Sequence, residues 1–208
     1  VKRRSELMQA AVPIGIGAMA AVLGLDDDTI VSLCEEASTI GVAEPVNFNS
    51  PGQVVIAGNT EAVLRAMQLA KQRGAKRAVQ LPVSVPSHCS LMLPAAEKLA
   101  SDLASIAIGD GVFPVLHNVT VSDAEDAAAV RDLLARQLHS PVRWVETVRA
   151  MHASGVTTVL EMGPGKVLAG LNKRIEKSMA AIPVQQPGDL EQALAACQGT
   201  GNSQPEGD

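Results

Sequence analysis

Residues 42–57 read VAEPVNFNSPGQVVIA, and this stretch decides the expected fold. Two runs suited to strands, 42–49 and 53–57, lie on either side of Ser50-Pro51-Gly52. Proline followed by glycine is typical of a tight turn, because proline presets one backbone angle and glycine adopts the left-handed one. The stretch therefore predicts two strands joined by a tight turn.

The residues around this pair extend the pattern in both directions. The apolar run 17–24 predicts a buried strand, and 26–37 predicts a helix that starts at a cluster of aspartates. A second helix over 60–74 ends at a glycine, and 77–85 predicts a fourth strand. The resulting order, β-α-β-β-α-β, is that of the split-βαβ or ferredoxin-like unit. We expect it over residues 15–85.

The rest of the chain alternates more loosely between helices and strands. The N-terminal residues 1–9 and four later segments predict helices, namely 91–103, 123–138, 141–153 and 166–179. Strands are expected at 112–119 and 156–162, and a short strand followed by a helix at 181–197. The polar residues 198–208 cannot bury a core, so we expect a disordered tail there.

The composition limits the class of protein. The chain has 208 residues, is 47% hydrophobic and 19% charged, and carries a net charge of -5. Its few aromatic residues are Phe48, Phe113 and Trp144. Both properties argue against nucleic acid as a partner, although a local basic patch stays compatible with them. No apolar run approaches the length of a membrane span. Three cysteines without a CxxC pair indicate a reducing compartment, so we expect a cytoplasmic protein.

The stretch Pro82–Cys89 carries the most informative side chain, His88. Histidine is the side chain best suited to moving a proton near neutral pH, although a histidine after a strand is more often a packed or surface residue. In an extended segment the neighbours Ser87 and Cys89 point away from it. A nucleophile for His88 must therefore come from elsewhere in the fold.

Other candidate sites are weaker. The three remaining histidines, His117, His139 and His152, lack metal-ligand spacing, so we expect no metal and no cofactor. The turn 163–166 (GPGK) lacks the spacing and the Ser or Thr of a phosphate-binding loop. A strand-to-helix turn is the favoured interpretation, although a helix N-terminus there could attract an anion.

Several stretches together resemble the malonyl-CoA:acyl carrier protein transacylase family of bacterial fatty acid synthesis. They are Arg4–Gln9 (RSELMQ) with Ala11–Pro13, Gly17–Ala21 (GAMAA), Pro45–Gly58 (PVNFNSPGQVVIAG), Pro82–His88 (PVSVPSH) and Glu161–Leu168 (EMGPGKVL). They follow the family's order across nearly the whole chain. The resemblance implies a partial α/β-hydrolase-like core, formed by 1–14 and 86–197, with an inserted ferredoxin-like subdomain over 15–85.

The same resemblance implies roles for single residues. His88 matches the catalytic histidine, and Arg4 matches the arginine that holds the malonyl carboxylate. Arg3 is adjacent, but the ungapped step to Met8-Gln9 selects Arg4. Ser154 falls where the family uses a backbone carbonyl to orient the histidine. Asn49 and Asn118 match polar residues of the substrate pocket.

The sequence also departs from the family. The GHSxG turn that carries the nucleophilic serine, and the GQGxQ segment upstream of it, do not occur in the 208 residues. The similarity begins just after that turn. We therefore expect this segment to be the C-terminal two-thirds of such an enzyme and to be inactive by itself.

The implied reaction transfers a malonyl group from malonyl-CoA to acyl carrier protein, and the implied enzyme is monomeric when full length. Carrier proteins are acidic, so a docking surface should be basic. A cluster around 71–77 is the candidate: Lys71, Arg73, Lys76 and Arg77. A solvated helix end with cations near its C-terminus explains the cluster equally well.

Two other functions stay open. The chain could be the acyltransferase domain of a polyketide-type synthase, or a non-catalytic module that binds a carrier protein. The polar tail and the sequence Val-Pro-Ser-His at 85–88 favour a stand-alone transacylase.

Overall fold

The computed structural model describes residues 1–83, 85–109 and 111–199, and it shows a mixed α/β protein. The chain divides into two compact units, 1–147 and 148–208. None of the helices in the described part of the chain is both long and apolar enough to cross a membrane.

The first unit contains a four-stranded sheet. Its strands are β1 (Gly17–Leu23), β2 (Ala43–Ser50), β3 (Gln53–Asn59) and β4 (Arg77–Gln80), in the spatial order β2-β3-β1-β4. All neighbouring pairs are antiparallel, and Ala20 of the central strand β1 lies opposite Ile56 on one side and Gln80 on the other. The strands and helices follow the predicted order. The last strand ends at Gln80 rather than Val85, because Pro82 has no backbone donor to continue the ladder.

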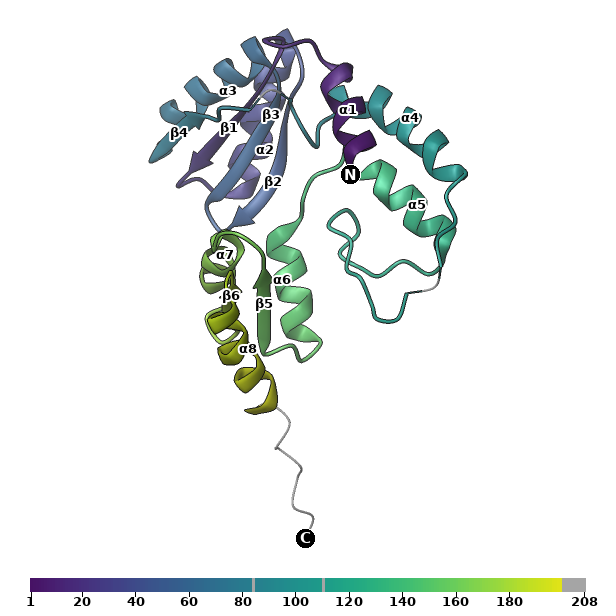
Figure 1. The fold of residues 1–208 in the computed structure, drawn as a ribbon. Coiled ribbons are helices and arrows are strands. Elements are labelled where there is room, and N and C mark those ends of the chain that lie inside the picture. The colour runs from purple at the N-terminus through teal and green to yellow at the C-terminus, as the bar shows by residue number, and fades with distance from the viewer. Residues whose placement is uncertain (84, 110, 200–208) are drawn as a thin grey trace. The chain divides into compact units, whose positions relative to one another are not determined.

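Helices α2 (Asp27–Ala37) and α3 (Thr60–Gln72) cover one face of this sheet, and a short 3-10 helix, η1 (Ser38–Ile40), follows α2 (Figure 1). The first helix starts where the sequence predicts, since the Asp26 carboxylate accepts a hydrogen bond of 2.8 Å from the Thr29 backbone N–H. Apolar side chains fill the space between helices and sheet. They include Ala20, Val22, Ile30, Leu33, Val54, Ile56 and Val63, all at most 1% exposed.

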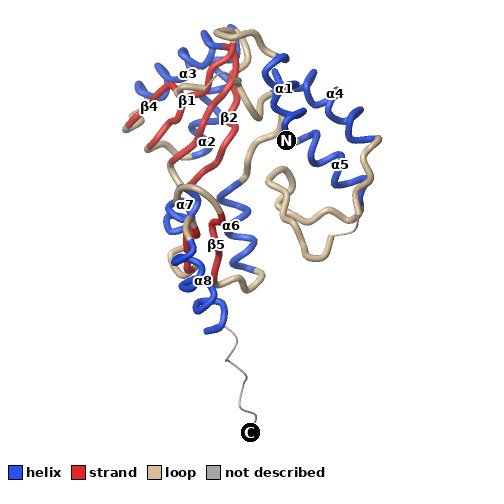
Figure 2. The backbone as a smooth tube through the Cα atoms, in the orientation of Figure 1, coloured by secondary structure: helices blue, strands red, loops and turns tan. Residues whose placement is uncertain are grey.

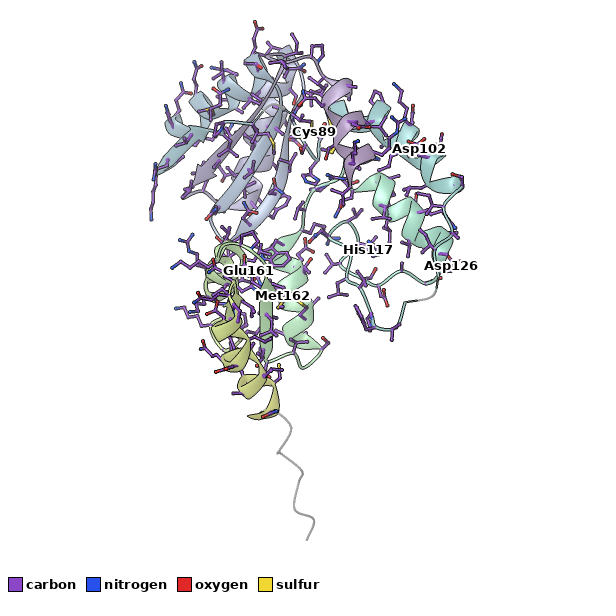
Figure 3. The ribbon with its side chains drawn as sticks, viewed as in Figure 1. Cys89, Asp102, His117, Asp126, Glu161 and Met162 are labelled. Atoms are coloured by element: carbon purple, nitrogen blue, oxygen red, sulfur yellow. The ribbon has the colours of Figure 1, made fainter. Side chains whose placement is uncertain are left out.

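The opposite face of the sheet packs against the segment that contains the candidate histidine. Met19, Val46, Val55 and Ala57 form a buried cluster there with Cys89, which is labelled beside the sheet in Figure 3. Gly17 allows a further close approach, because a Cβ atom at this position would lie 2.5 Å from the ring of Pro86. The stretch before and after His88 is thus fixed to the sheet.

A helical layer completes the first unit. It consists of α1 (Lys2–Ala11), α4 (Leu93–Ala104) and α5 (Ala127–Arg136), with the short 3-10 helix η2 (Ser90–Met92) leading into α4. The helices α1 and α5 both pack against α4. Leu7, Met8, Met92, Leu99 and Leu138 form the core between them.

The prediction of a strand at 112–119 is wrong. The described residues of the long connection between α4 and α5, which is drawn as a loop in Figure 2, contain only an isolated bridge between His117 and Ser122. Val112 and Phe113 are 96% and 73% exposed, and Pro114 interrupts the run of donors. A β-prone sequence without a neighbouring strand to pair with does not form a sheet.

The second unit contains two parallel strands, β5 (Thr158–Met162) and β6 (Ala180–Val184), packed with helices α7 (Val167–Ile175) and α8 (Pro187–Gly199). Helix α6 (Trp144–Ala153) spans the boundary of the two units. Of the expected disordered tail, residues 198–199 belong to α8, and 200–208 lie outside the described residues.

Candidate active site

His88 lies in a turn between the sheet and the helical layer of the first unit. Its backbone angle φ is 68°, a left-handed conformation that is uncommon for residues other than glycine. The backbone N–H donates a hydrogen bond of 2.9 Å to the carbonyl of Leu138. The next residue, Cys89, is fully buried, and its thiol donates to the Pro86 carbonyl at 3.1 Å.

The imidazole of His88 is oriented by a backbone carbonyl. Its Nδ1 lies 2.7 Å from the carbonyl oxygen of Gln137. Because a carbonyl oxygen only accepts hydrogen bonds, the neutral ring must carry its proton on Nδ1 and leave Nε2 as the basic nitrogen. Burial lowers the pKa of His88, the hydrogen bonds to Gln137 and Ser140 oppose this effect, and the positive charge of Arg4 adds to it. The ring is therefore held neutral and basic.

The neighbouring cysteine does not compete as a nucleophile. Burial raises the pKa of the Cys89 thiol to about 12, and the charge of Glu44 contributes in the same direction. Only the thiolate is reactive, so this thiol is inert near neutral pH. The expectation that the nucleophile for His88 lies elsewhere agrees with this environment.

A cavity of about 530 Å³ adjoins the histidine, and all of its lining residues belong to the first unit. Apolar side chains of α4 and α5, Leu99, Leu103 and Leu134, form much of its wall. The polar lining consists of Arg4, His88, Asn118 and Gln137. The structure thus brings together three of the five residues predicted for catalysis and substrate binding: His88, Arg4 and Asn118.

Arg4 is the only cationic side chain among the described residues of that lining. It projects from α1, and its buried Nε has no hydrogen-bond partner among the described residues. Burial lowers the pKa of this guanidinium. An unpartnered buried donor costs stability unless a ligand satisfies it, so the cavity is suited to an anion with two acceptor oxygens. Arg3 is different, since it pairs with Asp102 at 2.7 Å.

The two asparagines differ. Asn118 lines the cavity, and its Oδ1 lies 3.4 Å from the hydroxyl oxygen of Thr147, which donates at 2.9 Å to the carbonyl of Arg143. Asn49 lies near the end of β2, beside an irregularity in the pairing with β3, and does not line the cavity.

The prediction that the carbonyl of Ser154 orients the histidine is wrong. Ser154 follows α6, and its hydroxyl donates to the carbonyl of Met151 at 2.8 Å, whereas the carbonyl on Nδ1 is that of Gln137. Gln137 is the C-cap of α5. The last carbonyls of a helix have no hydrogen-bond partner within the helix. The predicted helix end at Leu138 was therefore the one sequence signal for a free carbonyl near this position.

The four residues of the predicted docking patch lie around the end of α3 and the start of β4, and each is exposed. Arg73 bonds to Glu36 at 2.7 Å and to Ser32 at 3.1 Å. Among the described residues, no carboxylate forms an ion pair with Lys71, Lys76 or Arg77, so the patch presents three cations without such a partner.

A carboxylate of the chain itself lies at the N-terminus of the helix that follows the GPGK turn. The carboxylate of Glu161, at the end of β5, accepts hydrogen bonds from the backbone N–H groups of Leu168 and Ala169 at 3.1 and 2.7 Å. The N-terminus of α7 is thereby satisfied from within the second unit. Among the described residues, no three His, Cys, Asp or Glu side chains are grouped to hold a metal ion.

The described cavity thus combines a carbonyl-oriented histidine with a half-buried arginine, in a mixed α/β fold. In general such a pair of groups is able to take up a proton and to bind an anion. The chain belongs to the acyl transferase domain family, whose model matches residues 1–199. The malonyl CoA-acyl carrier protein transacylases of Salmonella typhimurium and Escherichia coli K12 are each 54% identical to it over 194 residues. That alignment covers 93% of this chain, which spans 63% of the length of these relatives.

Solved structures of malonyltransferases are also similar to this chain. An acyl-carrier-protein S-malonyltransferase from Burkholderia pseudomallei matches with a TM-score of 0.91 and 50% identity, over 93% of this chain and 63% of that one. A malonyl-transacylase in complex with the acyl carrier protein of a type II polyketide synthase matches with a TM-score of 0.91 and 52% identity, over 93% and 62%.

Proposed function

We propose that this chain supplies the general base and the carboxylate-binding residue of a malonyl-CoA:acyl carrier protein transacylase. The observation that carries the proposal is the shared cavity of His88 and Arg4, in which burial favours the neutral imidazole and the Arg4 Nε has no hydrogen-bond partner among the described residues. The names of the relatives favour this enzyme over a polyketide-synthase domain or a non-catalytic carrier-binding module.

In the proposed reaction a serine from outside the 208 residues attacks the malonyl thioester, since the chain contains no GHSxG sequence. His88 Nε2 takes the serine proton and gives it to the departing CoA thiolate. A malonyl-serine ester results. The thiol of the carrier's phosphopantetheine then loses its proton to His88 and attacks the ester, and the serine oxygen recovers that proton. Free CoA and malonyl carrier protein are the products.

Arg4 would select the acyl group. Its guanidinium can hold the free malonyl carboxylate through two parallel hydrogen bonds. An acetyl group lacks this carboxylate and would leave the buried Nε without a partner. Asn118 would line the same pocket, Asn49 is retained only as a weaker candidate outside the cavity, and Ser154 is not proposed for a role at the histidine.

The finer description of the fold belongs to the same proposal. The β-α-β-β-α-β order and the strand order β2-β3-β1-β4 support a ferredoxin-like subdomain. The parallel pair β5-β6, followed by helices, supports a part of an α/β-hydrolase-like core. Acyl carrier protein is the proposed partner, and the cytoplasm is the proposed compartment.

The test joins this chain to the part of the Escherichia coli relative that it does not span and measures malonyl transfer to acyl carrier protein. We expect transfer by this chimera and a loss of at least about 100-fold in His88→Ala, the usual scale for a general base. Arg4→Ala should lose the preference for malonyl-CoA over acetyl-CoA. Undiminished transfer by the His88→Ala chimera would refute the assigned base.

A further inference from the structure

One carboxylate links the sheet directly to the turn that carries His88. Glu44, near the start of β2, accepts two hydrogen bonds from Ser90, which lies two residues after His88. The Ser90 backbone N–H donates to one carboxylate oxygen at 2.9 Å, and the Ser90 hydroxyl donates to the other at 2.6 Å. Bonds to an ionised acceptor are about twice as strong as neutral ones.

This contact is long-range, since Glu44 and Ser90 are 46 residues apart in the sequence. The contact is partly buried. Glu44 belongs to the sheet, because it lies in β2 opposite Ala57 of β3. Glu44 has no contact with the imidazole among those that orient it, which come from Gln137 and Ser140. Its effect on the histidine must therefore pass through the backbone of the turn.

The backbone at His88 requires such support. A side-chain-bearing residue in the left-handed region costs roughly 1–3 kcal/mol and persists only where the surroundings fix it. On one side, the carbonyl of Leu138 holds the His88 N–H. On the other side, burial fixes Cys89 in the sheet cluster and Glu44 fixes Ser90. The strained residue is thus clamped between two anchors.

We propose that Glu44 is a positioning residue for the general base: through its two hydrogen bonds to Ser90, it keeps His88 in the left-handed conformation that aims the imidazole into the cavity. The catalytic consequence rests on the proposed function, whereas the structural consequence does not.

The first test measures amide hydrogen exchange in the 208-residue chain. In Glu44→Ala we expect the His88 amide, whose own acceptor is Leu138, to exchange at least tenfold faster, while amides of the β1–β3 ladder keep their rates. Glu44→Gln should keep wild-type exchange, because its amide can accept from the Ser90 N–H and donate to the hydroxyl. Equal His88 exchange in wild type and Glu44→Ala would overturn the proposal.

The second test uses the active chimera. We expect Glu44→Ala to lower kcat at least tenfold with KM for malonyl-CoA changed less than twofold, since the base is misplaced and the arginine is not. Glu44→Gln should restore kcat to within about threefold. The control is Glu176→Ala, which removes a local pair of bonds from a serine N–H and hydroxyl, both donated by Ser178 to one carboxylate oxygen at 3.1 and 2.6 Å, and should leave kcat unchanged.

The outcomes separate the two proposals. An inactive wild-type chimera contradicts the proposed function, and the exchange rates then decide the role of Glu44 alone. In an active chimera, a kcat that survives Glu44→Ala, or one that falls equally in Glu44→Ala and Glu44→Gln, overturns the positioning role. A similar loss in Glu176→Ala also overturns it, because the effect would then not be specific to the turn.

Discussion

His88 and Arg4 each sit where a positive charge is disfavoured. Burial lowers the pKa of both groups, and the charge of Arg4 lowers the pKa of His88 further. The two cations respond differently, because an arginine stays charged in proteins whereas a histidine readily gives up its proton. The cavity therefore holds one fixed cation and one neutral base, which fits the proposed malonyl substrate.

A pH titration tests this electrostatic coupling. We expect the imidazole of His88 to titrate below its ordinary pKa of 6.5, and Arg4→Met to raise the midpoint by removing a nearby charge. Since the folded-state pKa is lowered, protonation opposes folding, so stability is lost as pH falls below about 6.5. NMR of the His88 ring protons provides the measurement.

The neighbouring residue supplies the control for this titration. Arg3→Met removes the same charge from the same helix, but Arg3 is paired with Asp102 and does not contribute to the pKa shift of His88. Its midpoint should equal that of the wild type. A wild-type midpoint in Arg4→Met would contradict the coupling.

At the scale of elements, the sequence predicts well where local chemistry decides. Asp26 begins α2 and the turn at Pro51 joins β2 to β3, as capping and turn residues require. The sequence predicts poorly where a structure depends on contacts with residues distant in the chain. The segment 112–119 has strand-like residues, but in the part of the chain that the structure describes no strand pairs with it. Gln137 orients His88 through a backbone carbonyl, which any residue type could provide, so its identity carries no signal.

Helix α7 offers a test of a tertiary cap. Glu161→Ala removes both hydrogen bonds to the first N–H groups of the helix, and we expect a loss of about 1 kcal/mol in the free energy of unfolding, the usual scale for a helix cap. Urea unfolding followed by circular dichroism measures it. Glu191→Ala, at an exposed position of α8, should change the value by less than about 0.5 kcal/mol. Equal stabilities of the two variants would show that the cap contributes nothing.

At the scale of the whole molecule, charge is unevenly spread. The net charge of -5 on these 208 residues would repel the proposed acidic carrier protein, so the proposed docking relies on a local excess of cations. The proposed patch contains Lys71, Lys76 and Arg77, while Arg73 is engaged by Glu36. Exposed charges act chiefly on encounter and are screened by salt, so their contribution should appear in the KM for the carrier rather than in the chemistry.

Charge reversal tests this patch in the active chimera. We expect Lys76→Glu with Arg77→Glu to raise the apparent KM for acyl carrier protein several-fold at low salt and to leave hydrolysis of malonyl-CoA unchanged, because both residues lie outside the cavity of His88. Lys98→Glu, at an exposed position on α4, is the control for charge reversal outside the patch. It is matched with the single variants Lys76→Glu and Arg77→Glu, because each of the three lowers the net charge by two. The difference between patch and control should shrink as salt is raised from 0.05 to about 0.5 M, where screening acts within a few ångströms. An unchanged KM in the patch variant, or an equal rise in Lys98→Glu, would mean that the carrier docks elsewhere and that these cations only stabilise the end of α3.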